Sequence, residues 1–190
     1  MDAPVLNNDN TLSRLTTRIE SDLQPDTLDA LQPVRMNGKL ADVYLQFANS
    51  EPALRAYLHM ERSLSEGSLD EREREAVKLW VSQQTGCDYC LSIHSMKAAR
   101  AGISSSAQVA LREGHAIGDE RIDCLISIAS RLMSHPGSLG DEILAKARAC
   151  AITDENLVDL TMVISTIFFT NITNHINDSK SPLPPAPSLS

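Results

Sequence analysis

The sequence predicts an all-α protein, a helical bundle, and two observations support this fold class. Apolar side chains recur at i, i+3, i+4 and i+7 along most of the chain, which is the spacing of one helix face. No sustained alternation of apolar and polar residues, as a half-buried strand would need, is found. The length of 190 residues suits one domain, and an apolar content of 42% is enough for a core.

The first two helices of the regular part of the chain are set by their apolar spacing and by a capping signal. One helix follows Ser50. The next is predicted to begin at Ser68, where Glu71 three residues later completes a capping-box pattern. The polar and glycine residues at 83–86 predict a break after it.

A third helix is predicted from near Cys87 to Gly102, because glycine is the preferred residue just beyond a helix end. The remaining helices are predicted as a short one that begins with the capping-box spacing of Ser105 and Gln108, one over 122–133 closed by Pro136, one at 143–147 and a last long one capped by Thr153.

Composition divides the chain into three parts. Residues 1–33 are polar and weakly patterned and are expected to form a loosely docked arm. Residues 34–178 form the predicted helical domain. Residues 179–190 are proline-rich and predict a disordered or polyproline tail.

Charge and hydropathy limit the kinds of binding partner and the cellular compartment that we expect for this protein. A net charge of −8 and a pI near 5.0 argue against nucleic-acid binding and against docking on anionic lipid. No secretory signal is expected at the N-terminus. The uncharged stretch 160–177 holds too many polar residues for a membrane span and predicts a bundle or oligomer helix. We therefore expect a cytoplasmic protein, in which a close cysteine pair is catalytic or metal-binding.

The candidate site is a short motif of four residues. On a helix that starts near Cys87, the side chains of Cys87, Cys90 and His94 fall within one sector of about 60°. The same side carries apolar residues, so the motif lies on the packed face of the helix. Glu75 belongs to the preceding helix and can reach the motif if the two helices form a hairpin.

This pattern fits thiol redox chemistry. Thiols in the first turn of a helix lie near unpaired N–H groups and the positive helix end, which favour the thiolate. His94 lies one turn after Cys90, where it can take or relay the thiol proton. A thiolate attacks a peroxide to give a sulfenic acid, which a neighbouring thiol condenses into a disulfide. A close pair is therefore what such a reaction requires.

The spacing of Glu75, eleven intervening residues and Cys87-x-x-Cys90-x-x-x-His94 resembles the AhpD branch of the carboxymuconolactone decarboxylase-like family, the alkylhydroperoxidases. The resemblance covers roughly residues 35–178. It implies an all-helical bundle, a homotrimer or homohexamer, and reduction of a small-molecule hydroperoxide in antioxidant defence by a dithiol without metal or cofactor. A thiol or dithiol, which can be a protein, would be the reductant.

Carried over to this chain, the resemblance implies that Cys90 attacks the peroxide and Cys87 resolves. His94, through a water, would pass the Cys90 proton to Glu75. Alkylhydroperoxidases of this type carry a second histidine between the cysteines, where this chain has Tyr89. Tyr89 is expected to point away from the motif, and weaker or differently directed peroxidase activity is expected.

Other interpretations stay open at this point. The cysteine pair can exchange disulfides with a protein partner as a reductant or stress sensor. A decarboxylase or lactone-type enzyme of the same family, or a metal-binding scaffold, are further alternatives. Zinc would need a fourth ligand beside Cys87, Cys90 and His94, from His115 or Cys124. Cys124 and Cys150 are otherwise expected to be core residues.

Overall fold

The computed structural model describes residues 13–135 and 137–189, so the expectations for residues 1–12 and for Pro136 lie outside the described residues. Over these ranges the secondary structure is helical, and a single bridge between Met36 and Lys39 is all the β structure they contain. The prediction of an all-α fold is confirmed. The Asn37-Gly38 turn lies inside that bridge, with both residues at positive φ.

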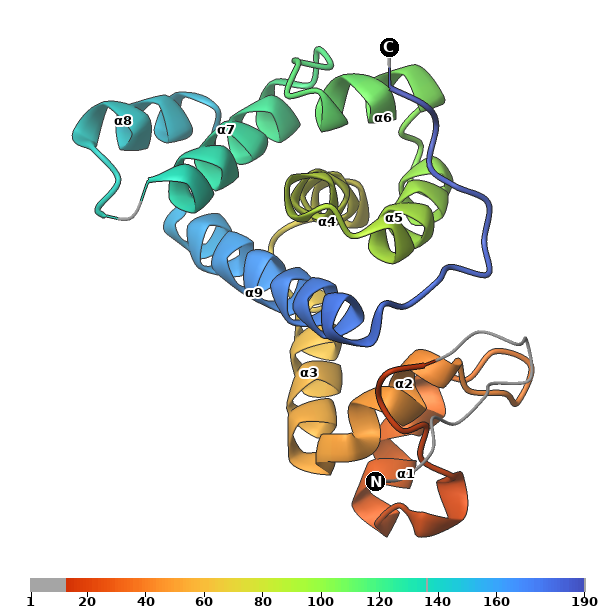
Figure 1. Ribbon diagram of the computed structural model, residues 1–190. Helices are drawn as coiled ribbons and strands as arrows, with labels where there is room; N and C mark the ends of the chain where they lie inside the picture. The colour runs from red at the N-terminus through yellow and green to blue at the C-terminus, as the bar shows by residue number, and fades with distance from the viewer. Residues whose placement is uncertain (1–12, 136, 190) are drawn as a thin grey trace.

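Helix α4 is the centre of the bundle (Figure 1). The helices around it are those predicted from the apolar spacing, and α8 packs chiefly on α7 at the rim. The bounds of these helices are α4 (Glu71–Thr85), α5 (Asp88–Arg100), α6 (Ser105–Arg112), α7 (Glu120–Ser134), α8 (Asp141–Ala149) and α9 (Asp154–Asn177).

Helix α4 begins two residues later than predicted. Its N-cap is Asp70, and Glu73 completes the capping box, with each side chain bonded to the other residue's backbone N–H. Ser68 instead donates to an Asp159 oxygen of α9 at 2.7 Å, so its hydroxyl serves a tertiary contact. The helix ends at Gly86, whose φ of +68° turns the chain directly into α5.

The N-terminal helices form a second, smaller core. Residues 13–33, expected to be a weakly patterned arm, contain α1 (Pro25–Leu31), which packs on α3 (Glu51–Leu64). Together with α2 (Asp42–Phe47), these helices bury Leu31, Phe47 and Leu54 against one another. Phe169 of α9 joins this cluster and stacks on Tyr57 with ring centroids 5.4 Å apart. The two cores therefore meet along α9.

The C-terminal segment, residues 179–189, also differs from the expected disordered tail. It runs extended from the end of α9 past α5 to α6 (Figure 1). Arg112 of α6 donates to the carbonyl of Pro187, and Ala186 packs against the main core. Extended proline-rich chain has no internal hydrogen bonds, so these contacts hold it in place.

Helix α9 supplies buried residues to both cores. Thr153 and Asn156 form its capping box, as the sequence indicated for Thr153. By length and composition α9 could cross a membrane, but a core helix meets the same criterion. Its inward residues Leu160, Val163 and Ile167 are at most 2% exposed and pack in the main core.

Candidate active site

The two cysteines of the motif lie at the start of α5. Cys87 is the N-cap, and its Sγ accepts a hydrogen bond from the Cys90 backbone N–H at 3.3 Å. Both cysteines are free and only 3% exposed. They are held there because Gly86 reverses the chain between α4 and α5, which pack side by side as a hairpin.

The hairpin brings Glu75 and His94 into contact. Glu75 Oε2 lies 2.7 Å from His94 Nδ1, and both side chains are buried. A carboxylate at Nδ1 fixes the tautomer in which Nδ1 carries the hydrogen. His94 Nε2 is then an unprotonated nitrogen, available as a base.

Electrostatics keep this pair as a carboxylate and a neutral imidazole near pH 7. Burial alone would raise the pKa of Glu75, but His94, Lys78 and Lys97 outweigh it and hold that pKa at about 2. Burial lowers the pKa of His94 below its usual range, and the Glu75 carboxylate offsets this only in part. The pair therefore holds one negative charge, on Glu75.

The two thiols differ in their readiness to ionise. A hydrogen bond from the Cys90 thiol lowers the pKa of Cys87, with help from the Cys90 and Tyr89 backbone N–H groups and against the effect of burial. The same thiol–thiol hydrogen bond, followed by burial, raises the pKa of Cys90 well above its usual range. In the resting dithiol the negative charge is therefore favoured on Cys87.

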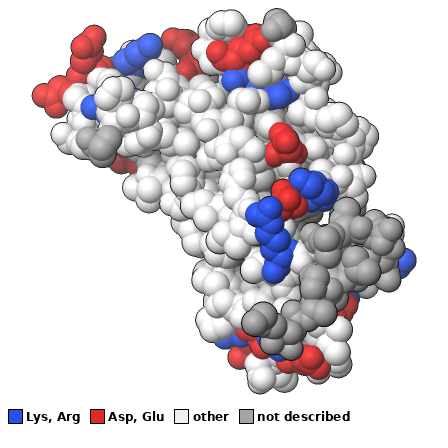
Figure 2. All heavy atoms as spheres, viewed as in Figure 1, with Lys and Arg blue, Asp and Glu red and all other residues white. Residues whose placement is uncertain are grey.

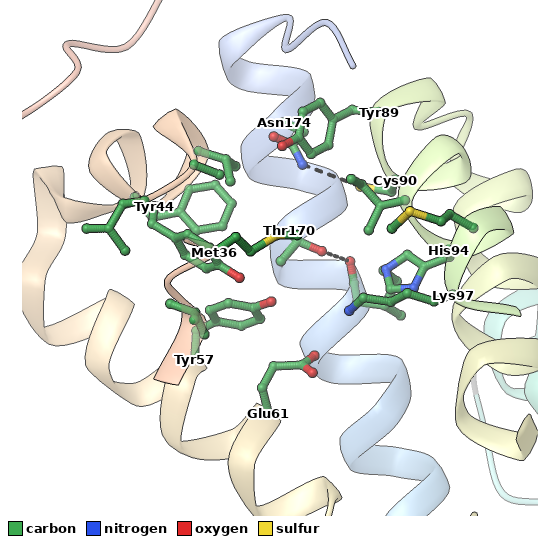
Figure 3. A pocket seen from close by; sticks show the side chains of 18 of the residues that line it. Met36, Tyr44, Tyr57, Glu61, Tyr89, Cys90, His94, Lys97, Thr170 and Asn174 are labelled. Carbon is green, nitrogen blue, oxygen red and sulfur yellow. Dashed lines mark hydrogen bonds between the residues drawn. The ribbon is translucent and has the colours of Figure 1, made fainter. Parts of the chain in front are cut away.

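Cys90 and His94 border a cavity of about 380 Å³ (Figure 3). Its walls are α5 and α9 on one side and the N-terminal helices on the other. Tyr44 and Tyr57 supply aromatic wall, and Lys97 points into the space. Small-molecule sites are typically of this size, mainly apolar, with a few polar groups that orient the ligand.

Tyr89 also borders this cavity, which corrects the expectation that it points away from the motif. The expectation considered only the α5 face that packs on α4. The cavity lies on a neighbouring side of α5, where Tyr89 and Cys90 are adjacent (Figure 3). Burial raises the pKa of Tyr89 to about 12, so its hydroxyl remains protonated.

Cys87 faces a second, smaller space. It does not border the large cavity but lines a cleft of about 130 Å³, whose other wall includes Ser179, Lys180 and Ser181 of the C-terminal segment. Asn174 borders both the cleft and the cavity. The dithiol therefore has one sulfur toward each space.

Asn174 of α9 is a site residue that the sequence did not indicate, and Asn171 and Asn177 lie on the same helix one turn to either side of it. Asn174 Nδ2 donates to Cys90 Sγ at 3.4 Å, and its Oδ1 is buried without a partner. Asn171 Nδ2 donates to Thr85 Oγ1 at 2.7 Å, and Asn177 Nδ2 to Gln46 Oε1 at 2.9 Å. The three-residue spacing of Asn171, Asn174 and Asn177 was the available signal, because it places three amides on one side of α9, and buried polar groups need partners.

The residues considered for the alternative zinc site do not lie together. His115 is exposed beside Glu113, and Cys124 lies on α7 in the main core. In residues 13–135 and 137–189, no three His, Cys, Asp or Glu side chains are placed to hold a metal ion.

The fold and the site together describe an all-helical protein with a buried dithiol beside a carboxylate–imidazole pair. The sequence pattern of the carboxymuconolactone decarboxylase family matches residues 51–117, which contain α3, α4, α5, α6 and the whole motif. Over residues 51–117 the chain is thus similar to this family, in agreement with the resemblance found in the sequence. No curated protein shows a significant match to the sequence.

Solved structures of similar fold include three relevant ones. A peroxidase-related protein with an alkylhydroperoxidase AhpD core from Ralstonia eutropha JMP134 superposes with a TM-score of 0.78 at 18% identity, covering 89% of this chain and 92% of its own. A peroxidase-related protein from Silicibacter sp. TM1040 gives 0.73 at 19% identity, with 90% of each chain covered. The debrominase Bmp8, in a cysteine-to-alanine variant bound to 2,3,4-tribromopyrrole, gives 0.69 at 18% identity, covering 88% of this chain and 90% of that one. At these identities the likeness concerns the fold.

Proposed function

We propose that this protein is a thiol-dependent peroxidase that reduces organic hydroperoxides, or hydrogen peroxide, through Cys87 and Cys90. The observation that carries the proposal is that Cys90 and His94 border one cavity while His94 is bonded to Glu75. A nucleophile, a base and a group that orients the base are the parts such a reaction needs.

In the first step the Cys90 proton moves to His94 Nε2, directly or through a water. The thiolate attacks the terminal oxygen of the hydroperoxide, an S–O bond forms and the O–O bond breaks. The leaving alkoxide takes the proton from His94 and departs as an alcohol. Because the Cys90 thiol is reluctant to ionise by itself, the base is needed at this step.

In the second step Cys87, already favoured as a thiolate, attacks the Cys90 sulfenic acid. The S–S bond forms, and the hydroxide that leaves is protonated to water. A thiol or dithiol from outside, small or on a protein, then reduces the disulfide. The cleft at Cys87 supports an approach of this reductant from the side opposite the peroxide.

The test is a single-turnover reaction of the reduced protein with cumene hydroperoxide. In protein that also carries Cys124→Ser and Cys150→Ser, loss of hydroperoxide and loss of both remaining thiols are expected together. In the same background Cys90→Ser should abolish both losses, whereas Cys87→Ser should consume one equivalent and stop at the sulfenic acid. Persistence of both thiols while a control dithiol peroxidase turns over would overturn the proposal. Slow peroxide reduction with fast exchange against a protein disulfide would favour the thiol–disulfide oxidoreductase instead.

Reductive dehalogenation of a small aromatic is a second candidate. It is favoured by the aromatic wall of the cavity, formed by Tyr44, Tyr57, Tyr89 and Phe47 beside Cys90, and by the fold of Bmp8. Such a reaction would replace a carbon–halogen bond with carbon–hydrogen while two thiols become a disulfide and halide leaves. Bromide release from a polybrominated pyrrole by the reduced protein would support it, and its absence would exclude it for that substrate.

The proposal includes assembly into a homotrimer or homohexamer. The support is the α9 surface, where Val158, Ile172 and Ile176 are 66%, 48% and 56% exposed. Figure 2 views the molecule from the side on which α9 lies, and the middle of this face is largely uncharged. Light scattering at micromolar concentration is expected to give a multiple of the 20.8 kDa chain mass, and a monomer would contradict the assembly.

A further inference from the structure

A second pair of cysteines lies outside the candidate active site. Cys124 is on α7, and Cys150 is the residue that caps the end of α8. Both are free, with Cys124 only 3% exposed and Cys150 half-buried. The two side chains border one cavity of about 370 Å³, together with Lys146 and Asp123.

A hydrogen bond from Arg121 holds the turn that follows Cys150 against α7. Arg121 lies one turn before Cys124 on the same side of α7, and its Nη1 donates to the carbonyl of Ala151 at 2.7 Å. Ala151 follows Cys150 directly, and its φ of +56° reverses the chain at the end of α8. The turn that carries Cys150 is therefore fastened to the α7 surface that carries Cys124.

The two thiols also interact electrostatically. Burial, then hydrogen bonding and Coulomb interaction with the Cys150 thiol, raise the pKa of Cys124 to about 11, while Lys146 and Arg121 act in the opposite direction. Thiols in such contact need only a small approach to reach bonding distance. Helix α8 stands at the rim of the bundle and packs chiefly on α7, so it can make this adjustment (Figure 1).

We propose that Cys124 and Cys150 are a second redox-active dithiol, which a hydroperoxide oxidises to a reversible disulfide between α7 and the end of α8. The half-buried Cys150 is the sulfur that attacks. Its thiolate bonds to the terminal peroxide oxygen as the O–O bond breaks and an alcohol leaves. The Cys124 sulfur then displaces hydroxide, which leaves as water with the remaining proton. Two thiols lose two electrons, and the peroxide gains them.

This site is independent of the proposed activity at Cys87 and Cys90. The surroundings of this second pair differ from those of Cys87 and Cys90. Lys146 lies one turn before Cys150, and no histidine of the described part of the chain borders the cavity. Glu120 and Asp123 also border it, but Asp123 is occupied by the backbone N–H groups of Ile117 and Gly118. Oxidation would fasten the otherwise peripheral α8 to the bundle.

The experiment uses the full chain with Cys87→Ser and Cys90→Ser, so that Cys124 and Cys150 are the only cysteines. After treatment with hydrogen peroxide or diamide, the remaining thiols are labelled with a maleimide and the intact mass is measured. A monomer that has lost two hydrogens, takes no label and recovers two labels after dithiothreitol is expected. The matched control, with Cys150→Ser added, should form no intramolecular disulfide.

Two labels after oxidation, or sulfinic acid without a cross-link, would overturn the proposal. The melting temperature of the oxidised double variant is expected to rise by about 2–5 °C over the reduced form, since the bond closes a long loop. If the double variant does not fold, peptide mapping of oxidised wild-type protein decides the question. A peptide linking Cys124 to Cys150 supports the pair, and its absence at full oxidation of Cys87 and Cys90 refutes it.

Discussion

Replacing Glu75 with glutamine tests how much the ionised Glu75 carboxylate stabilises the folded protein. Glutamine keeps the shape of the side chain but resembles the protonated carboxyl. In the folded protein the pKa of Glu75 is about 2, against a usual value of 4.5. Each pKa unit corresponds to about 1.4 kcal/mol. The carboxylate form therefore stabilises the folded chain by about 3 kcal/mol relative to the uncharged form, and Glu75→Gln should lose about that amount at pH 7.

The stabilisation by the Glu75 carboxylate should depend on pH in a definite direction. A lowered pKa in the folded state gives stability that is complete above the unfolded value of 4.5 and is lost as the pH falls toward 2. The difference between wild type and Glu75→Gln should therefore be about 3 kcal/mol at pH 7, where His94 is neutral in both proteins. Below 4.5 it should shrink by about 1.4 kcal/mol per pH unit.

The assay is urea unfolding at a series of pH values between 7 and 3. Glu71→Gln is the matched control, because Glu71 is exposed one turn earlier on the same helix. Its unfolding free energy should differ from wild type by less than about 0.5 kcal/mol. Parallel curves for wild type and Glu75→Gln over the whole range would refute the reasoning, because the carboxylate would then gain nothing from His94.

The same variant should also lose activity. Without the carboxylate, His94 loses the partner that fixes its tautomer and stabilises its protonated form. General acid–base catalysis is commonly worth a factor of about 100 to 10,000, so peroxide reduction by Glu75→Gln should fall at least about 100-fold. Unchanged turnover in protein shown to be folded would remove Glu75 from the proton route.

Three further predictions concern other contacts. Asn174→Leu should lower the rate of peroxide reduction about tenfold in stopped-flow assays, because a hydrogen bond to a charged sulfur is worth about 1.5 kcal/mol. An unchanged rate would show that this hydrogen bond does not contribute to the reaction. Lys78→Met should cost about 3 kcal/mol in urea unfolding, because Lys78 is 3% exposed and donates to both Glu61 oxygens; a loss below about 0.5 kcal/mol would count against it. Removing residues 179–190, which include the cleft wall Ser179, Lys180 and Ser181, should speed alkylation of Cys87 by iodoacetamide, measured by peptide mass spectrometry; an unchanged rate would mean that the segment does not limit access.

Much of the bundle could be predicted from sequence because its signals are local. Apolar spacing and end signals located α3 to α9, with errors of one or two residues where several polar residues compete for the N-cap. At α4, Asp70 takes that position and Ser68 bonds to Asp159 instead. The break between α4 and α5 was predicted from the polar and glycine residues at 83–86. The contact between Glu75 and His94 was expected only if the two helices formed a hairpin, and the structure has both.

The structural features that could not be predicted from the sequence depend on contacts between segments that lie far apart in the chain. Helix α1 is only seven residues long, which is too short to show a clear apolar period, and its burial depends on α3. The cavity exists only where α2, α3, α5 and α9 meet, so no single periodicity describes it. Cys150 was expected to be a core residue, and only the turn held by Arg121 places it opposite Cys124.

The asparagines of α9 have a consequence for how this chain can vary in length. One inserted residue upstream of Asn171 would rotate the rest of the helix by about 100°. That single insertion would break all three asparagine hydrogen bonds together, those of Asn171 to Thr85, Asn174 to Cys90 and Asn177 to Gln46. Relatives of this protein should therefore accommodate added residues in the connections between helices, and hold the number of residues between Thr153 and Asn174 fixed.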